Sequence, residues 1–232
     1  MNRISELVCT HSAIPLVLAM AFGAFLIPGW LPPPDPALGA DQIVDMFTDR
    51  RMRIQVSANL VAIGAMFYGT FTAMIAVQTA RIEGASRPLT YVQLVMIPLT
   101  IIVIWLPAYL WLAMAYRLEA SAATMQIFND LAWLIFVGGL QPAIIQMLAV
   151  AGSILQDKRE VPLYPKWVAY VTIWMTLSSF TVMIVPFFQT GPFTWKGLLC
   201  FWLAGGTFAS WLLLMWVMTV KSINKHYASL AE

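Results

Sequence analysis

Six long apolar segments, almost free of charge, constrain this chain more than any other feature. Asp130 is the only charged side chain within them. A helix needs about 20 apolar residues to cross the roughly 30 Å hydrocarbon core of a bilayer, whereas barrel strands are about 10 residues long and alternate in polarity. Only 10% of the residues are charged, against roughly 25% in soluble domains. The predicted membrane-spanning helices are residues 13–30, 54–80, 91–116, 127–155, 167–188 and 197–220.

The sequence therefore predicts an all-α fold, a polytopic transmembrane helical bundle in which residues 1–232 form a single transmembrane domain. A short amphipathic helix is expected between the first two spans. There, aspartates recur every fourth residue from position 41 to 49, and Ile43, Val44 and Phe47 share another face. We expect this helix to lie on the outer membrane surface. Its acidic face is either a rim that attracts cations or simply a solvated surface.

The charges in the connections predict an orientation. Those on the side of the N-terminus carry eight lysines and arginines, and those on the opposite side carry five. Because cytoplasmic loops carry the excess of positive charge, both termini are expected to be cytoplasmic.

Small residues are aligned along the second span. They recur at spacings of three and four, so they form one stripe on which another helix can approach closely. A weaker version of the stripe occurs in the fourth span. The stripe indicates close packing inside the bundle or, alternatively, a homo-oligomer interface. Its members are Ala58, Ala62, Ala65, Gly69, Ala73, Ala76 and Ala80.

The ten tryptophans are expected to divide into two groups. Those near helix ends are predicted to form the aromatic belts that mark membrane interfaces. The deeper ones are expected to fill space between helices or to line an apolar cavity. The first group is Trp30, Trp111, Trp133 and Trp195 at outer ends with Trp167 and Trp216 at inner ends, and the second is Trp105, Trp174, Trp202 and Trp211.

A few polar side chains within or beside the spans are the candidates for a ligand pocket. Asp130 and Gln141 are three turns apart on one predicted helix, so they would share a face and span about 16 Å. They form either a polar track from an outer mouth to a central binding point, or two separate structural contacts. In the second case Gln141 bonds another helix and Asp130 pairs with Arg117. The candidate residues are Gln141, Gln146, Asn59, Asp130 and Arg117.

Familiar catalytic and cofactor chemistries have no counterpart in the sequence. His11 and His226 lie outside the spans, and Cys9 and Cys200 are too far apart in the chain to form a metal knuckle. Phosphate-binding, nucleophile-elbow and dinucleotide motifs are absent. The sequence therefore predicts no metal and no cofactor, and its net charge of +2 gives no reason to expect nucleic acid.

Four motifs at helix ends and turns resemble those of a family of bacterial polytopic membrane proteins with no established activity. The resemblance covers residues 42–220 and implies a bacterial inner (plasma) membrane protein. Because that family has no established activity, it assigns no catalytic or binding residue. The motifs are Asn129-Asp130-Leu131-Ala132-Trp133, Gln141-Pro142 with Gln146, Pro165-Lys166-Trp167 and Thr190-Gly191-Pro192-Phe193.

Three classes of function remain open. The first is binding or permeation of a small lipophilic molecule, which mid-membrane amides, deep tryptophans and proline-kinked helices favour. The second is a structural or accessory subunit that partners another membrane subunit, favoured by the small-residue stripes. The third is a membrane-embedded enzyme of the isomerase or hydratase type acting on a lipophilic substrate. Such an enzyme would use Asp130, Tyr116 or Arg117 near the outer surface.

Overall fold

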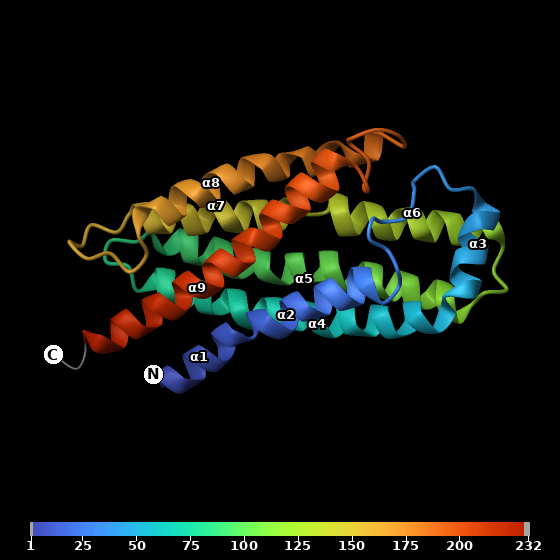
Figure 1. The fold of residues 1–232 in the computed structure, drawn as a ribbon. Coiled ribbons are helices and arrows are strands. Elements are labelled where there is room, and N and C mark those ends of the chain that lie inside the picture. Colours follow the sequence, from blue (N-terminus) through green and yellow to red (C-terminus); the bar gives the residue numbers. More distant parts are fainter. Residues whose placement is uncertain (1, 230–232) are drawn as a thin grey trace.

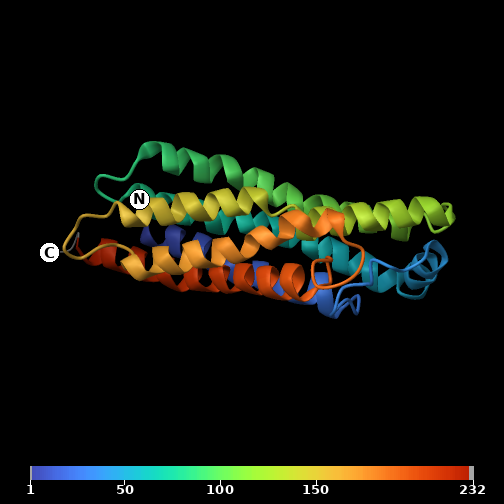
Figure 2. The ribbon, with the colours of Figure 1, turned by 90° about the horizontal axis from the view of Figure 1, so that it is seen from above.

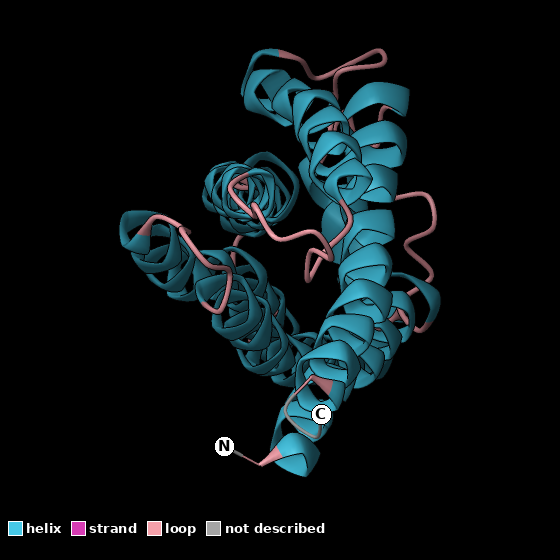
Figure 3. Ribbon diagram, turned by 90° about the vertical axis from the view of Figure 1, so that its left-hand side faces the viewer, coloured by secondary structure: helices cyan, strands magenta, loops and turns pink. Residues whose placement is uncertain are grey.

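The computed structural model describes residues 2–229 and contains helices but no strand among them (Figure 3). Six helical segments are long and apolar enough to cross a membrane, which confirms the predicted bundle. The elements are α1 (Arg3–His11), α2 (Ala13–Leu18), η1 (Ala19–Leu26), α3 (Ala40–Asp49), α4 (Arg51–Ala80), α5 (Arg87–Tyr116), α6 (Ala122–Gly138), α7 (Gln141–Leu155), α8 (Lys166–Ser179), η2 (Phe180–Phe187), η3 (Leu198–Gly205) and α9 (Gly206–Ala228).

The spans run lengthwise beside one another (Figure 1). We call the end where α1 begins and α9 finishes the terminal end, and the opposite one the α3 end. The α8 helix packs against both α7 and α9, and these three helices lie next to one another in Figure 2. The α9 helix crosses the bundle obliquely (Figure 1).

The small-residue stripe of α4 packs inside the chain. Ala58, Ala65 and Ala76 are buried. A Cβ atom placed on Gly69 would lie 2.9 Å from Ile101 of α5. Beside the stripe, a Cβ atom placed on Gly64 would lie 2.6 Å from the Cβ of Ala19 in the first span. Small side chains thus let α4 approach two neighbours closely, which is how helices associate where lipid removes the hydrophobic driving force.

The fourth span, expected over residues 127–155 with a bend at Pro142, is broken into two helices. The α6 and α7 helices are separated at Gly139 and Leu140. Pro142 explains the break, because a proline ring has no N–H and clashes with the carbonyl four residues earlier. That carbonyl, on Gly138, instead accepts a hydrogen bond from the Gln141 side chain at 2.6 Å. The expectation that Asp130 and Gln141 share one face of an uninterrupted helix was therefore wrong.

Three other spans change helical type along their length, which the sequence analysis did not anticipate. The first span continues from α2 into η1, and the sixth begins with η3, both of which are π-helical. The fifth ends in η2, a 3₁₀ segment. Because π-helical turns are rare and occur frequently at functional sites, η1 and η3 direct attention to the region between the first and sixth spans.

The short amphipathic helix is present as α3 and lies across the α3 end of the bundle (Figure 1). Its apolar residues Ile43 and Phe47 are buried. The ring centroid of Phe47 lies 6.2 Å from that of Trp30, and α3 packs chiefly against α6. The apolar face that we expected to rest on the membrane surface thus packs on protein.

The tryptophans follow the prediction only in part, since Trp211 is buried between helices as expected but several others are placed differently. Trp30, Trp111 and Trp133 form a buried cluster with ring centroids 5.0–5.4 Å apart instead of an interfacial belt. Trp174 and Trp202, expected between helices, are 63% and 48% exposed on the outside of the bundle. Residue type and depth alone did not reveal which way each indole faces, because that depends on how the helices are rotated about their axes.

Candidate functional site

An apolar pocket of about 290 Å³ lies between the first and sixth spans. Its side walls come from these two spans, and its floor comes from Tyr68 of α4, Ile104 of α5, and Phe136 and Val137 of α6. No charged side chain is among the lining residues. The sequence-based hypothesis of a tryptophan-lined cavity does not describe it, since its aromatic lining residues are one tyrosine and phenylalanines.

The two π-helical segments face each other across this pocket. Met20, Ala21 and Phe25 of η1 line one side, while Cys200, Phe201 and Gly205 belong to η3 on the other. The wider turns of a π-helix shift the register of the side chains that follow. The irregular halves of both spans therefore shape the pocket, and the regular halves lie nearer the terminal end.

The first and sixth spans contact each other on both sides of the pocket. Towards the α3 end, Phe25 and Phe201 meet edge to face, with ring centroids 5.3 Å apart. Towards the terminal end, Trp216 donates its indole N–H to Nδ1 of His11 at 3.1 Å. Between these contacts the spans enclose the pocket, whose rim includes the exposed Ala209.

Tyr68 supplies the polar group of the pocket wall. Its hydroxyl donates to Oε1 of Gln146 on α7 at 2.5 Å, and both side chains are fully buried. The amide nitrogen Nε2 of Gln146 has no hydrogen-bond partner among the described residues. A buried donor without a partner costs about 1–3 kcal/mol. Tyr68 thus lines the apolar cavity, whereas Gln146 is not among the lining residues and is fully buried.

The structure places the other sequence-based candidates apart from this pair. Gln141 caps α6 as described above. Asn59 is exposed and donates to the carbonyl of Gln55 in its own helix at 2.8 Å. Asp130 is partly buried and accepts a 3.4 Å hydrogen bond from its neighbour Asn129. These residues do not form a track, and Gln146 alone reaches the pocket wall through Tyr68.

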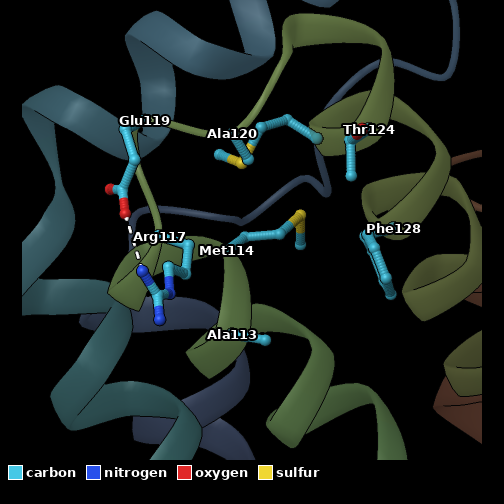
Figure 4. Close-up of a pocket in the computed structure, with 8 residues that line it drawn as sticks. Ala113, Met114, Arg117, Glu119, Ala120, Thr124 and Phe128 are labelled. Carbon is cyan, nitrogen blue, oxygen red and sulfur yellow. Dashed lines mark hydrogen bonds and ion pairs between the residues drawn. The ribbon is translucent and has the colours of Figure 1, made fainter.

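A second hollow of about 400 Å³ lies at the α3 end between α5 and α6 (Figure 4). Arg117 borders it and pairs with Glu119 at 3.1 Å instead of with Asp130 as expected. Both partners are 69% exposed, and exposed ion pairs contribute little to stability or specificity. Met114 and Phe128 make the remaining wall largely apolar (Figure 4). This hollow is the weaker candidate, because its polar groups face solvent and are already paired.

A buried polar network at the terminal end was missed by the sequence analysis. Glu6, only 4% exposed, accepts two hydrogen bonds from Arg81 at 2.6 and 2.8 Å. Gln78 donates to the same carboxylate at 2.8 Å, and Tyr227 donates to it at 3.0 Å. The oxygen of Gln78 accepts from Ser222 at 3.3 Å. The network joins the first, second and sixth spans, and an acid placed just before an apolar helix was its only sequence signal.

A similar group lies nearby in the bundle. The Gln93 amide nitrogen donates to Thr79 at 3.2 Å and to Ser153 at 3.3 Å, so that one amide connects the second, third and fourth spans. Gln93 also accepts from the Thr79 hydroxyl. Such interhelical bonds are worth about 0.6 kcal/mol each, and these polar groups serve to hold helices together.

The fold and the pocket together define a multi-pass helical membrane protein. Compared with known proteins, the chain matches no family model, no curated protein and no solved structure. Across residues 2–229, no group of three or more histidine, cysteine, aspartate or glutamate side chains is placed to hold a metal ion.

Proposed function

We propose that this integral membrane protein binds a small lipophilic molecule in the pocket between the first and sixth spans. The observation that carries the proposal is the apolar cavity of about 290 Å³ between the two π-helical segments, with Tyr68 in its lining. Small-molecule sites are typically apolar cavities of about 300–1,000 Å³ with a few placed polar groups. The volume suits a small molecule or one end of a longer chain.

The surroundings of the pocket favour a ligand that arrives from the bilayer. Val17, Ala21 and Ala209 form part of its lining and are partly or fully exposed on the outside of the bundle. A lipophile dissolved in the membrane would meet this opening without crossing water. We further propose a bacterial inner membrane, with both termini in the cytoplasm, on the basis of the family resemblance and the positive charge of the loops.

Two adjacent glycines provide the test. Gly205 lines the pocket, Gly206 does not, and a Cβ atom on either would have no neighbouring atom within 4 Å. Gly205→Leu should fill the cavity, and Gly206→Leu should add the same bulk outside it. We expect binding of a fluorescent lipophilic probe to the purified protein to fall at least tenfold in Gly205→Leu only. Equal binding by both variants would contradict the proposal.

The enzyme alternative has less support. Arg117 pairs with Glu119, and Tyr116 is exposed beside it, so the residues expected to act with Asp130 do not converge. The accessory-subunit alternative predicts that both glycine variants leave probe binding unchanged and that a partner chain copurifies.

The proposed orientation has its own test. Single cysteines at Asp41 of α3 and at exposed Lys158 in the α7–α8 loop should react with an impermeant thiol reagent from opposite sides of the membrane, Asp41 from outside. A Cys9→Ser and Cys200→Ser background removes the two native thiols. Labelling of Asp41 from the cytoplasmic side would reverse the orientation.

A further inference from the structure

The hollow at the α3 end has charged groups on one side and apolar walls on the other. Arg117 and Glu119 belong to the connection between α5 and α6, whereas Met114 of α5 and Phe128 of α6 belong to the spans themselves. Figure 4 shows the ion pair on one side of the hollow and Phe128 on the other. None of the lining residues also lines the pocket between the first and sixth spans. The hollow is therefore separate from that pocket.

The hollow lies where two spans end, at the depth expected for a lipid headgroup. The third span ends at Tyr116, and the fourth begins at Ala122. Tyr116 is exposed, and the guanidinium carbon of Arg117 lies 5.5 Å from the centre of its ring. Exposed tyrosines are typical of the boundary between hydrocarbon and headgroups. The charged side of the hollow is thus placed to meet headgroups, and the apolar side to meet hydrocarbon.

Exposed apolar side chains continue from the hollow along both helices towards the middle of the spans. Tyr109 lies one turn from Ala113 on α5, and Leu131 lies one turn from Phe128 on α6. A hydrocarbon chain that leaves the hollow can follow this surface. At about 30 Å³ for each water-sized group, the volume of about 400 Å³ accommodates roughly 13 heavy atoms. That is enough for a headgroup and the first part of one chain.

The exposed ion pair can exchange its own partners for those of a ligand. Arg117 and Glu119 are largely exposed, and pairs of this kind contribute little to stability. A hydrogen bond from its own backbone N–H, the Arg117 guanidinium and the charge of Arg51 hold the pKa of Glu119 below its usual 4.5, so the carboxylate is charged at neutral pH. Arg51 itself is exposed and donates its Nε to the carbonyl of Ala115 at 2.9 Å. The charged side of the hollow thus presents both signs of charge.

We propose that the hollow binds a zwitterionic phospholipid whose headgroup carries a phosphodiester and a primary ammonium, as in phosphatidylethanolamine. Arg117 donates to the phosphate oxygens, which its planar guanidinium matches with two parallel hydrogen bonds. Glu119 accepts from the ammonium group. An anionic phospholipid would pair with Arg117 but would bring its negative charge next to Glu119. A choline headgroup has no N–H to donate to that carboxylate.

Three phospholipids with identical acyl chains test the proposal. The full-length protein in detergent is titrated with phosphatidylethanolamine, phosphatidylcholine or phosphatidylglycerol, and bound lipid is measured by native mass spectrometry. We expect phosphatidylethanolamine to bind about five- to tenfold more tightly than phosphatidylcholine, because only its ammonium donates hydrogen bonds to Glu119. Phosphatidylglycerol should also bind more weakly than phosphatidylethanolamine. Glu119→Gln should abolish the preference over phosphatidylcholine, and Arg117→Gln should weaken the binding of both zwitterionic lipids.

A matched pair of charges at the terminal end controls for a general loss of surface charge. Glu83 lies in the connection before α5, Arg87 is the first residue of α5, and both are exposed. The double variant Glu83→Gln/Arg87→Gln removes the same two charges as Arg117→Gln/Glu119→Gln, but away from the hollow. Only the second should change lipid selectivity. Because both pairs are exposed, all variants should melt like the native protein, and the comparison of the three lipids on native protein needs no variant.

The outcomes are distinct from those that test the proposed function. Equal binding of phosphatidylethanolamine and phosphatidylcholine by the native protein, or tighter binding of phosphatidylglycerol, would overturn the headgroup proposal. A preference that survives in Glu119→Gln, or that disappears in Glu83→Gln/Arg87→Gln, would also overturn it. Gly205→Leu fills the other pocket and should leave the lipid preference unchanged, so either proposal can fail while the other stands.

Discussion

Two buried polar regions of this protein differ in how completely they are hydrogen bonded. At the terminal end, the Glu6 carboxylate is surrounded by donors from Arg81, Gln78 and Tyr227, and none of these side chains has an unpaired buried atom. At the pocket, Gln146 keeps an unpaired amide nitrogen. Because unmet hydrogen bonds are costly in an apolar interior, the complete network is suited to holding helices together. The incomplete pair instead leaves an unmet hydrogen bond next to the pocket and therefore stabilises its surroundings less.

An unpaired atom alone does not define a site. The indole nitrogens of the Trp30, Trp111 and Trp133 cluster are also buried without partners. Those rings pack against one another, and none of them lines the pocket. The Gln146 nitrogen differs in position, because the tyrosine that bonds to its amide lines the pocket.

The largest expected effect comes from breaking the complete network. Arg81→Met removes the cation and leaves the Glu6 carboxylate buried with fewer donors, so we expect a loss of about 3 kcal/mol in unfolding free energy. Arg3→Met is the matched control, because Arg3 contacts Asn224 at an exposed position. Thermal unfolding in detergent measures both. A similar melting temperature for Arg81→Met and native protein would show that the network does not hold the spans together.

A second fully bonded carboxylate at the terminal end gives a pH-dependent test. Burial alone would raise the pKa of Asp157, but hydrogen bonds from Arg159 and from the backbone N–H of Leu163 hold that pKa below its usual 3.8. The stabilisation is present above pH 3.8 and is lost as pH falls below that value. Native protein should therefore lose melting temperature more steeply below pH 4 than Asp157→Asn. Parallel profiles would contradict this.

Removing half of the incomplete pair should have a smaller effect on stability. Tyr68→Phe leaves both polar atoms of the Gln146 side chain unpaired and should cost about 1–2 kcal/mol. Adding Gln146→Leu should recover most of that loss, since no buried polar group then remains unpaired. Thermal unfolding of the native protein, of Tyr68→Phe and of the double variant Tyr68→Phe/Gln146→Leu is measured without added ligand. A double variant less stable than Tyr68→Phe would show that Gln146 has a structural role in spite of its free nitrogen.

The smallest effect is expected at Asn59. Its side chain is exposed and bonds only within its own helix, so Asn59→Leu should change the unfolding free energy by less than about 0.5 kcal/mol and leave probe binding unchanged. A loss of binding would mean that Asn59, one of the ligand-pocket candidates from the sequence, contacts the ligand at a site other than the pocket.

The sequence predicted the number and position of the spans, because hydrophobic length is a property of consecutive residues. It predicted α3 from the same kind of local periodicity. Pro142 was expected to bend the fourth span, but counting helical turns without interruption from Asp130 to Gln141 still placed these two residues on a common face. A break at a proline changes the directions in which all later side chains of the span point. Residues on its two sides therefore cannot be assigned to one helix face by counting residues per turn.

The pocket could not be predicted in the same way. It depends on π-helical turns in η1 and η3, which carry no reliable sequence signature, and on the rotation that brings Tyr68 to Gln146, 78 positions away in the chain. Gln146 was a candidate because amides are rare inside spans. Tyr68 was not, because a tyrosine in an apolar helix resembles any other core aromatic residue until its hydrogen bond is known.

Photoaffinity labelling tests the central claim most directly. A lipophilic ten-carbon probe carrying a diazirine at the end of its chain is cross-linked to the protein in nanodiscs, and labelled residues are identified by mass spectrometry. The account predicts labelling within η1 and between Cys200 and Leu212, removed by excess of the same probe without its diazirine and by Gly205→Leu but not by Gly206→Leu. Labelling confined to outward-facing residues such as Trp174, and unaffected by the competitor, would contradict the claim that the pocket holds a ligand.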